Sequence, residues 1–392
     1  MIRFRPRFTF ILFYSLLIFS LQAQVQVGAA QLDLYLPLLK GKQVGMVVNQ
    51  TSLVEKSHIV DTLLSRGIQI KRVFAPEHGF RGKADAGEAI DHQKEHDLPY
   101  EIYSLYGKQL RPDSASMADL DILVFDIQDV GVRFYTFTST MTYIMEACAK
   151  KNIPLLILDR PNPLGFCVDG PVLEPEHKSF VGLHPVPVIH GLTVAEYALM
   201  INGENWLKDS LHCNLILIPC TNYTHEMSLA LAEKPSPNLP NLLSIYLYPS
   251  LCLFEGTSVS MGRGTNKQFQ IYGHPLSILG NYEFRPEVGE GDKNPVQKGK
   301  LCRGFDLSNL EPDSLKPFLS FDLELISQFY EEASEEFKSI FFTNEKFFNK
   351  LTGNSWLLNG LKNGLTPTEL RMEWEDDLIT YLQMRKKYLI YP

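Results

Sequence analysis

The chain has 392 residues, of which 45% are hydrophobic and 21% charged, and its formal net charge is −8. This composition is that of an ordinary globular protein, and the length suits two domains. Binding to nucleic acid or to anionic membrane surfaces is not expected of an acidic chain, because both require clustered lysines and arginines.

Residues 1–23 have the layout of a secretory signal peptide. Three arginines within residues 1–7 precede a mostly apolar run over residues 8–21. This run is short for a membrane span, and no second apolar stretch follows it in the sequence. The first cysteine is Cys148, too far from the expected cleavage point to carry a lipid. We therefore expect an exported protein, periplasmic or secreted, without a membrane anchor.

Strand and helix patterns alternate through the first half of the chain. Helices are expected at residues 57–67, at roughly 135–150 and from Thr193, where TVAE forms a capping box. Buried strands are expected at residues 42–49, 68–75, 120–126, 153–159 and 214–220. Repeated strand–helix–strand units predict an α/β fold, a Rossmann-like doubly wound and mostly parallel sheet, over residues 24–235.

The segment 234–241 (KPSPNLPN) is rich in proline and marks the expected domain boundary. Beyond it, residues 246–265 have the composition of a loop, and helical patterns dominate towards the end of the chain. The clearest helix should begin at Thr366 as N-cap, with Pro367 in its first position and Glu369 completing a capping box, and run to about Tyr388. We therefore expect a second, smaller α+β domain over residues 236–392.

Three of the expected strands end in an acidic residue. These residues are Glu77, Asp126 and Asp159. If the strands are parallel, all three carboxylates reach the carboxyl edge of one sheet, where open α/β folds bind their ligands. Each acid alone could also form a structural ion pair, such as Glu77 with Arg81. That three strands end in this way favours a functional site.

The segments around the first two of these acids carry further polar residues. Glu77 lies in APEHGFRG, where flanking glycines would let a ligand approach a carboxyl group suited to proton transfer. In FDIQDVGVRFYT, Asp126 and Asp129 could bind a metal, orient water or pair with Arg133.

A glycine-rich segment of the second half, CLFEGTSVSMGRGT, contains Glu255 and Arg263. An arginine held between glycines can bind a carboxylate through two hydrogen bonds, which implies an anionic ligand group; an interdomain salt bridge is the alternative. His184 and His190 bracket HPVPVIH, and we expect ordinary hydrogen-bonded histidines there, since no third metal ligand stands at a fixed spacing.

Several common site motifs are missing from the sequence. It contains no GxGxxG after the first strand, no GxxxxGK[ST], no GxSxG and no CxxC. We therefore expect no cofactor and no bound metal. Most of the six cysteines lie in apolar segments, and both buried free thiols and a Cys213–Cys220 disulfide are compatible with the sequence.

Taken together, several segments resemble the exo-β-N-acetylmuramidase family, in order from about Lys40 to Tyr391. They are APEHGFRG, FDIQDVGVRFYTFTSTM, LDRPNPLG, GPVLEP, SFVGLHPVPVIHG, PSPNLP, CLFEGTSVSMGRGT and RKKYLIY. The resemblance implies release of β-linked N-acetylmuramic acid from the non-reducing end of peptidoglycan fragments, in a cleft between a Rossmann-like domain and a smaller one. It also implies that Glu77 is catalytic. The chain departs from the family pattern at VVNQTS, where a TNPTG-like turn is expected, and at QFQIYGHP.

The resemblance agrees with the strand-end acids, because glycosidases use one carboxylic acid to protonate the leaving oxygen and usually a second carboxylate. We expect Glu77 to be the acid and Asp126 the second carboxylate, with Glu255 as the alternative. Arg263 or Arg133 should bind the lactyl carboxylate of N-acetylmuramic acid. The expected substrate contacts are His78, Arg81, Asp129, Arg133, Tyr135, Asp159, Arg160, His190, Glu255 and Arg263.

Two other functions are compatible with the sequence. The first is a non-catalytic muropeptide-binding or carbohydrate-binding protein on the same scaffold. The second is a metal-dependent hydrolase that uses Asp126, Asp129 and His78. The expected partner of the protein is a peptidoglycan-derived saccharide.

Overall fold

The computed structural model describes residues 24–77, 79–80, 98–107, 109–229, 231–289 and 291–392. The predicted signal peptide and the expected substrate contacts His78 and Arg81 lie outside the described residues. Within the described ranges, none of the helices has the length and apolar character needed to cross a membrane.

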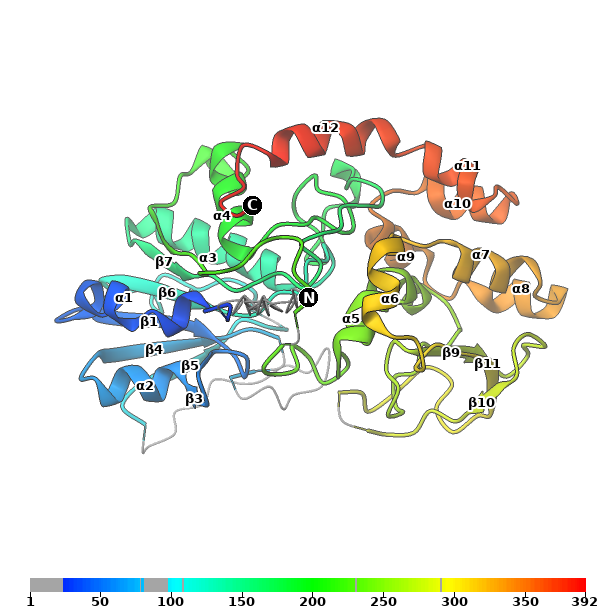
Figure 1. The fold of residues 1–392 in the computed structure, drawn as a ribbon, viewed down its shortest axis with the longest axis horizontal. Coiled ribbons are helices and arrows are strands. Elements are labelled where there is room, and N and C mark those ends of the chain that lie inside the picture. Colours follow the sequence, from blue (N-terminus) through cyan, green and yellow to red (C-terminus); the bar gives the residue numbers. More distant parts are fainter. Residues whose placement is uncertain (1–23, 78, 81–97, 108, 230, 290) are drawn as a thin grey trace, which may run out of the picture.

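A six-stranded sheet, parallel at every pairing, forms the first part of the protein (Figure 1). Its strand order is β5-β4-β1-β6-β7-β8, so the chain builds outward from β1 in one direction and from β6 in the other. This reversal confirms the expected doubly wound α/β fold. The strands are β1 (Gln43–Val48), β4 (Gln69–Ala75), β5 (Glu101–Ser104), β6 (Ile122–Asp126), β7 (Leu155–Leu158) and β8 (Leu215–Ile218).

Five of these strands match the expected ones, and the edge strand β5 was not foreseen. It is only four residues long and mostly half-buried, so it lacks the apolar run that identifies the central strands. A short hairpin of β2 (Leu53–Val54) and β3 (Ser57–His58) follows β1.

Helices cover both faces of the sheet (Figure 1). One apolar cluster joins the sheet to α1 (Leu32–Leu39) and α2 (Ile59–Ser65), and another joins the opposite face to α3 (Phe137–Lys151) and α4 (Val194–Gly203). Side chains alternate along a strand. In β6, Ile122 and Val124 therefore point towards α1 and α2, whereas Leu123 and Phe125 point towards α3. The same alternation fixes the direction of the residues at the strand ends.

The second part is α+β, as expected. It contains an antiparallel sheet of order β10-β11-β9. Its strands are β9 (Ile271–His274), β10 (Tyr282–Phe284) and β11 (Cys302–Asp306). Its helices are α5 (Leu242–Leu251), α6 (Pro312–Leu315), α7 (Glu324–Glu331), α8 (Glu335–Phe341), α9 (Glu345–Thr352), α10 (Trp356–Lys362), α11 (Pro367–Met372) and α12 (Glu375–Arg385).

Two local expectations in this part are corrected. Residues 246–251, expected as loop, complete α5, which is capped by Asn241 and Ser244 and tolerates Pro249 in its last turn. The capping box at Thr366 is confirmed, but the helix it begins ends at Met372. A new helix starts after Trp374, whose indole is buried against Phe321 and Trp356.

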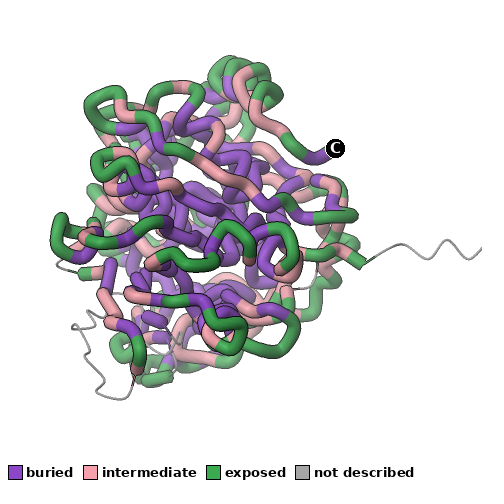
Figure 2. The backbone as a smooth tube through the Cα atoms, turned by 90° about the vertical axis from the view of Figure 1, so that its left-hand side faces the viewer, coloured by how far each residue is buried: buried purple, intermediate pink, exposed green. Residues whose placement is uncertain are grey.

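The two parts share one continuous core. The larger apolar cluster contains Phe125 and Met145 from the first part and Phe254 and Trp374 from the second. Figure 2 shows buried segments running through the middle of the molecule beneath exposed outer loops. After α12 the chain returns to the first part, and the carboxyl terminus lies beside α4 (Figure 1). The division at residues 235 and 236 stays a prediction.

Candidate active site

Glu77 stands two residues after β4, at the carboxyl edge of the sheet. Gly79 has a φ of +78° and its N–H donates to the carbonyl of Pro76, so a tight turn holds Glu77 at its corner. The Glu77 side chain is half-buried. Its Oε2 accepts a 2.7 Å hydrogen bond from the hydroxyl of Thr136, the residue that precedes α3. Glu77 therefore lies on the α3 face of the sheet, with its carboxylate placed for proton transfer.

Asp126 does not lie beside Glu77. Because β1 separates β4 from β6, the two strand ends are about two strand spacings apart, roughly 9–10 Å. Asp126 also follows the alternation of Ile122 and Val124, so it points towards α1 on the opposite face. Consistent with this position, burial and then the charge of Asp126 raise the pKa of Tyr35, a residue of α1.

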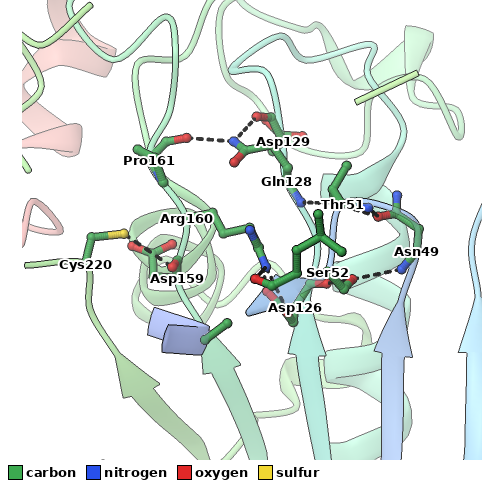
Figure 3. Close-up of polar contacts among 12 residues, drawn as sticks. Asn49, Thr51, Ser52, Asp126, Gln128, Asp129, Asp159, Arg160, Pro161 and Cys220 are labelled. Carbon is green, nitrogen blue, oxygen red and sulfur yellow. Dashed lines mark hydrogen bonds and ion pairs between the residues drawn. The ribbon is translucent and has the colours of Figure 1, made fainter. Parts of the chain in front are cut away.

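The carboxylate of Asp126 is fully buried and paired with Arg160 (Figure 3). Nε of Arg160 donates to Oδ1 at 2.5 Å and Nη2 donates to Oδ2 at 3.0 Å. Nη2 also donates to the carbonyl of Leu53. Each side chain is thus the charged partner of the other, and contact of either with a substrate stays a prediction.

Asp159 is likewise buried and occupied. Its Oδ2 accepts a 2.5 Å hydrogen bond from the hydroxyl of Tyr391, and its Oδ1 accepts one from the N–H of Ala195 at the start of α4. Burial raises the pKa of Asp159 to about 6. These contacts tie the carboxyl-terminal segment to the end of β7, and contact of Asp159 with a substrate stays a prediction.

Asp129, from the segment FDIQDVGVRFYT, and Glu77 both act on the same residue, Tyr135. Burial raises the pKa of Tyr135, and the charges of Asp129 and Glu77 raise it further. Oδ2 of Asp129 accepts from the N–H of Gly131 and lies 3.7 Å from Nε2 of His190. The other oxygen, Oδ1, is buried and has no hydrogen-bond partner among the described residues. Asp129 and His190 are thus a buried pair.

The turn after β1 is tied to the ends of β6 and β7 (Figure 3). The hydroxyl of Ser52 donates to the carbonyl of Asp126, and the hydroxyl of Thr51 accepts a 3.0 Å hydrogen bond from the N–H of Gln128. Gln128 in turn donates through Nε2 to the carbonyls of Asp129 and Pro161. The NQTS segment, where the chain departs from the family pattern, therefore braces the carboxyl edge. The polar residues of NQTS, which directly follow β1, were the sequence feature that could have pointed to this bracing role.

The proline-rich segment is held against the same edge. The hydroxyl of Tyr135 donates to the carbonyl of Pro235 at 2.7 Å. Nε2 of Gln50 donates to the same carbonyl and to that of Lys234. Residues of the sheet thus fix the chain where it passes to its second part.

Arg133 is bound by backbone carbonyls, and its expected contact with the substrate stays a prediction. Its side chain is 1% exposed. Nη1 donates to the carbonyls of Pro171 and Val186, and Nη2 donates to the carbonyl of Leu351 at the end of α9. The guanidinium joins the two parts of the protein from inside.

Glu255 and Arg263 form an ion pair within the second part. Nη2 of Arg263 donates to Oε1 of Glu255 at 2.5 Å, and the two side chains are 19% and 20% exposed. Oδ2 of Asp292 lies 4.0 Å from Nη1 of the same arginine. This is not the interdomain salt bridge considered from the sequence, and contact of either residue with a ligand stays a prediction.

Metal-binding geometry is not seen within the described ranges, where no three His, Cys, Asp or Glu side chains gather around a common point. His184 stacks on Trp206, and burial lowers the pKa of His184 to about 3. All six cysteines fall in the described part of the chain, where each is a buried free thiol, so Cys213 and Cys220 are not paired.

Family comparisons cover nearly the whole of this fold. The N-terminal model of the exo-beta-N-acetylmuramidase NamZ family matches residues 44–243, and the C-terminal model matches residues 246–391. The chain belongs to this family. The resemblance inferred from the sequence is confirmed, and the chain is assigned with the NamZ family to the glycoside hydrolases.

Individual relatives of the NamZ family support the assignment along the chain. The peptidoglycan beta-N-acetylmuramidase NamZ of Bacillus subtilis (strain 168) is 35% identical over 398 residues, covering 94% of this chain and 92% of the relative. A crystal structure of a DUF1343 family protein from Bacteroides fragilis NCTC 9343 is 42% identical with a TM-score of 0.85. A second such protein from the same organism is 25% identical with a TM-score of 0.77. Each structure matches over 94% of this chain and 99% of its own.

Proposed function

We propose that this protein is an exo-acting glycoside hydrolase that releases β-linked N-acetylmuramic acid from the non-reducing end of peptidoglycan fragments. Membership of the NamZ family supports the reaction. The observation that carries the assignment of the acid is the half-buried carboxyl group of Glu77, held through one oxygen at the carboxyl edge of the parallel sheet. Its other oxygen, Oε1, is the one we assign to proton transfer.

In this proposal Glu77 protonates the glycosidic oxygen as the bond to N-acetylmuramic acid breaks. Asp126 is set aside as the second carboxylate, because its charge is neutralised by Arg160 on the far face of the sheet. The two remaining choices are Asp129, whose charge acts together with that of Glu77 on the pKa of Tyr135, and Glu255 from the second part. Asp129→Asn and Glu255→Gln, measured side by side, decide between them: the catalytic one loses kcat with KM retained.

Glu77→Gln tests the central assignment, because it keeps the shape of the side chain and removes the transferable proton. Loss of a general acid costs about a hundredfold to ten-thousandfold in rate. The loss should be largest for a saccharide leaving group and much smaller for a nitrophenyl β-N-acetylmuraminide, whose leaving group needs little protonation. Near wild-type turnover of the saccharide by folded Glu77→Gln would reject the assignment.

Each of the two alternative functions would give a result that differs from ours in the assay with nitrophenyl β-N-acetylmuraminide. A non-catalytic binding protein would bind the nitrophenyl glycoside and release no nitrophenol. A metal-dependent hydrolase would lose activity in excess EDTA and regain it with a divalent ion. We expect turnover that persists in EDTA.

We also propose that the protein is exported and acts in cell-wall turnover or recycling. The proposal of export rests on the arginine-rich and apolar pattern of residues 1–23. Expression of the full chain followed by fractionation should give a periplasmic or secreted protein that begins near Gln24. A cytoplasmic protein with an intact amino terminus would contradict it.

A further inference from the structure

We propose that Thr136 is a positioning residue for the hydrolysis, which holds Glu77 through one oxygen and stabilises the carboxylate that forms when the proton leaves. The inference deepens the proposed function and rests on the role of Glu77 as the acid. The contact itself is a 2.7 Å hydrogen bond from the hydroxyl of Thr136 to Oε2 of Glu77.

Thr136 behaves differently from the threonines that precede two other helices of this protein. Thr193 before α4 and Thr366 before α11 each accept a hydrogen bond from the N–H three residues on, as N-cap residues usually do. Thr136 precedes the 15-residue helix α3 and makes no such capping bond. Thr136 has a φ of −69° and a ψ of −5°, whereas Thr193 and Thr366 have extended backbone angles, and the hydroxyl of Thr136 donates to Glu77 instead.

This hydrogen bond also determines which oxygen of Glu77 can act. The hydroxyl of Thr136 donates, so Oε2 is the accepting oxygen and the transferable proton resides on Oε1. Rotation of the carboxyl group is restricted by the same contact, since Thr136 is anchored in the backbone at the start of α3. The acid is therefore presented in one orientation.

The energetic argument depends on how the bond changes during the reaction. A hydroxyl donates roughly twice as strongly to a carboxylate as to a neutral carbonyl oxygen. As Glu77 gives its proton to the glycosidic oxygen, the bond from Thr136 strengthens. An interaction that is stronger in the transition state than in the ground state raises kcat, with little effect on substrate binding.

Three variants test the proposal. Thr136→Val keeps the shape and removes the donor, whereas Thr136→Ser keeps the donor. Thr142→Val is the control, because Thr142 lies in the same helix that Thr136 precedes and its buried hydroxyl bonds to Thr138 and His184 and not to Glu77. Kinetics are measured with a saccharide substrate and with a nitrophenyl β-N-acetylmuraminide, and folding is checked by circular dichroism.

With the saccharide, Thr136→Val should lower kcat about tenfold to a hundredfold and leave KM nearly unchanged. The loss should be much smaller with the nitrophenyl glycoside, which needs little acid assistance. Thr136→Ser should restore most of the rate, and Thr142→Val should resemble wild type with both substrates. A purely structural role for Thr136 would instead reduce both reactions equally, and that result would overturn the proposal.

A double variant separates this inference from the proposed function. Because Thr136 acts through Glu77, adding Thr136→Val to Glu77→Gln should cause no further loss of kcat. A multiplicative further loss would overturn the positioning role. If Glu77→Gln itself turns over the saccharide normally, the assignment of Glu77 as the acid fails, and this inference fails with it. If Glu77→Gln is inactive while Thr136→Val has normal kcat, only this inference fails. Should Thr136→Val not fold, Thr136→Ala removes the same donor and serves in its place.

Discussion

Arg160, from the loop after β7, donates to both carboxylate oxygens of Asp126 at the end of β6, and the pair is buried. The opposite charges that follow two adjacent strands, β6 and β7, therefore neutralise each other inside the fold. A buried ion pair of this kind is costly to break on one side, since the remaining charge is left without a partner.

Asp126→Asn should lower the free energy of unfolding by about 3–5 kcal/mol, because Arg160 stays charged and buried. Urea denaturation measures this loss. In the double variant Asp126→Asn/Arg160→Met the loss should be smaller than the sum of the two single losses. Asp119→Asn is the control: Asp119 pairs with Lys71 at 3.4 Å but is 75% exposed, so its loss should stay within about 1 kcal/mol. Equal losses for the two aspartates would contradict the prediction.

Some features of this protein can be predicted from its sequence, whereas the neighbours of a strand end cannot. Apolar runs identified five of the six strands of the main sheet, and the capping boxes at Thr193 and Thr366 are present. The order of the strands is not encoded in any local pattern. As β1 lies between β4 and β6, the acids at the ends of those strands are not neighbours.

Contacts between residues that are far apart in the sequence cannot be read from local patterns. Arg133 resembles a ligand-binding arginine until its bond to the carbonyl of Leu351, 218 residues away, is seen. Tyr391 lies 232 residues from Asp159, whose carboxylate it binds. Thr136 lies in the segment FDIQDVGVRFYTFTSTM. Its place at the start of a crossover helix at the carboxyl edge was the local feature that could have indicated a role beside Glu77. The turn that holds Glu77 is local, so its place after β4 could be predicted from the sequence, whereas its catalytic role stays a prediction.

The stability of the protein should depend on the protonation of Asp159. Burial raises its pKa from 3.8 to about 6. Between these values the folded protein holds a proton that the unfolded chain has released, so raising the pH favours unfolding. This contribution to stability is present below about pH 4 and is lost as the pH rises through 6.

Asp159→Asn removes the titrating group and gives the measurement. The free energy of unfolding of wild type, minus that of Asp159→Asn, should fall as the pH rises from 4 to 6 and then level off. Urea denaturation at several pH values gives this difference directly. A difference that stays constant from pH 4 to pH 7 would show that Asp159 does not titrate in this range.

The carboxyl-terminal segment should contribute to stability through Tyr391. Its hydroxyl donates to Asp159 and accepts from the N–H of Cys220 at 2.8 Å, and all three groups are buried. Tyr391→Phe leaves those groups without this partner, so the free energy of unfolding should fall by about 1–3 kcal/mol. Tyr388→Phe is the matched control, since the hydroxyl of Tyr388 bonds to the more exposed Glu204, which water can solvate in its place. A loss from Tyr388→Phe as large as that from Tyr391→Phe would argue against the burial of the contact as the cause.

Recognition of the lactyl carboxylate should depend on Arg263. The arginine is partly exposed and bound to Glu255, so a substrate carboxylate would share or replace that partner. Arg263→Ala should therefore raise the Kd for an N-acetylmuramic acid ligand about tenfold or more, as expected for loss of a charge-assisted hydrogen bond. The Kd for the N-acetylglucosamine analogue, which lacks the carboxylate, should change little. Calorimetry on the two ligands measures both values.

Glu255→Gln separates recognition by Arg263 from a supporting role of the ion pair. Neutralising Glu255 removes the negative charge that lies 2.5 Å from Nη2 of Arg263, while Asp292 stays 4.0 Å from Nη1. The N-acetylmuramic acid ligand should then bind as tightly as to wild type or more tightly, whereas the neutral analogue should be unaffected. If both Arg263→Ala and Glu255→Gln weaken the two ligands equally, the pair supports the fold of its loop, and the lactyl group is recognised by other residues.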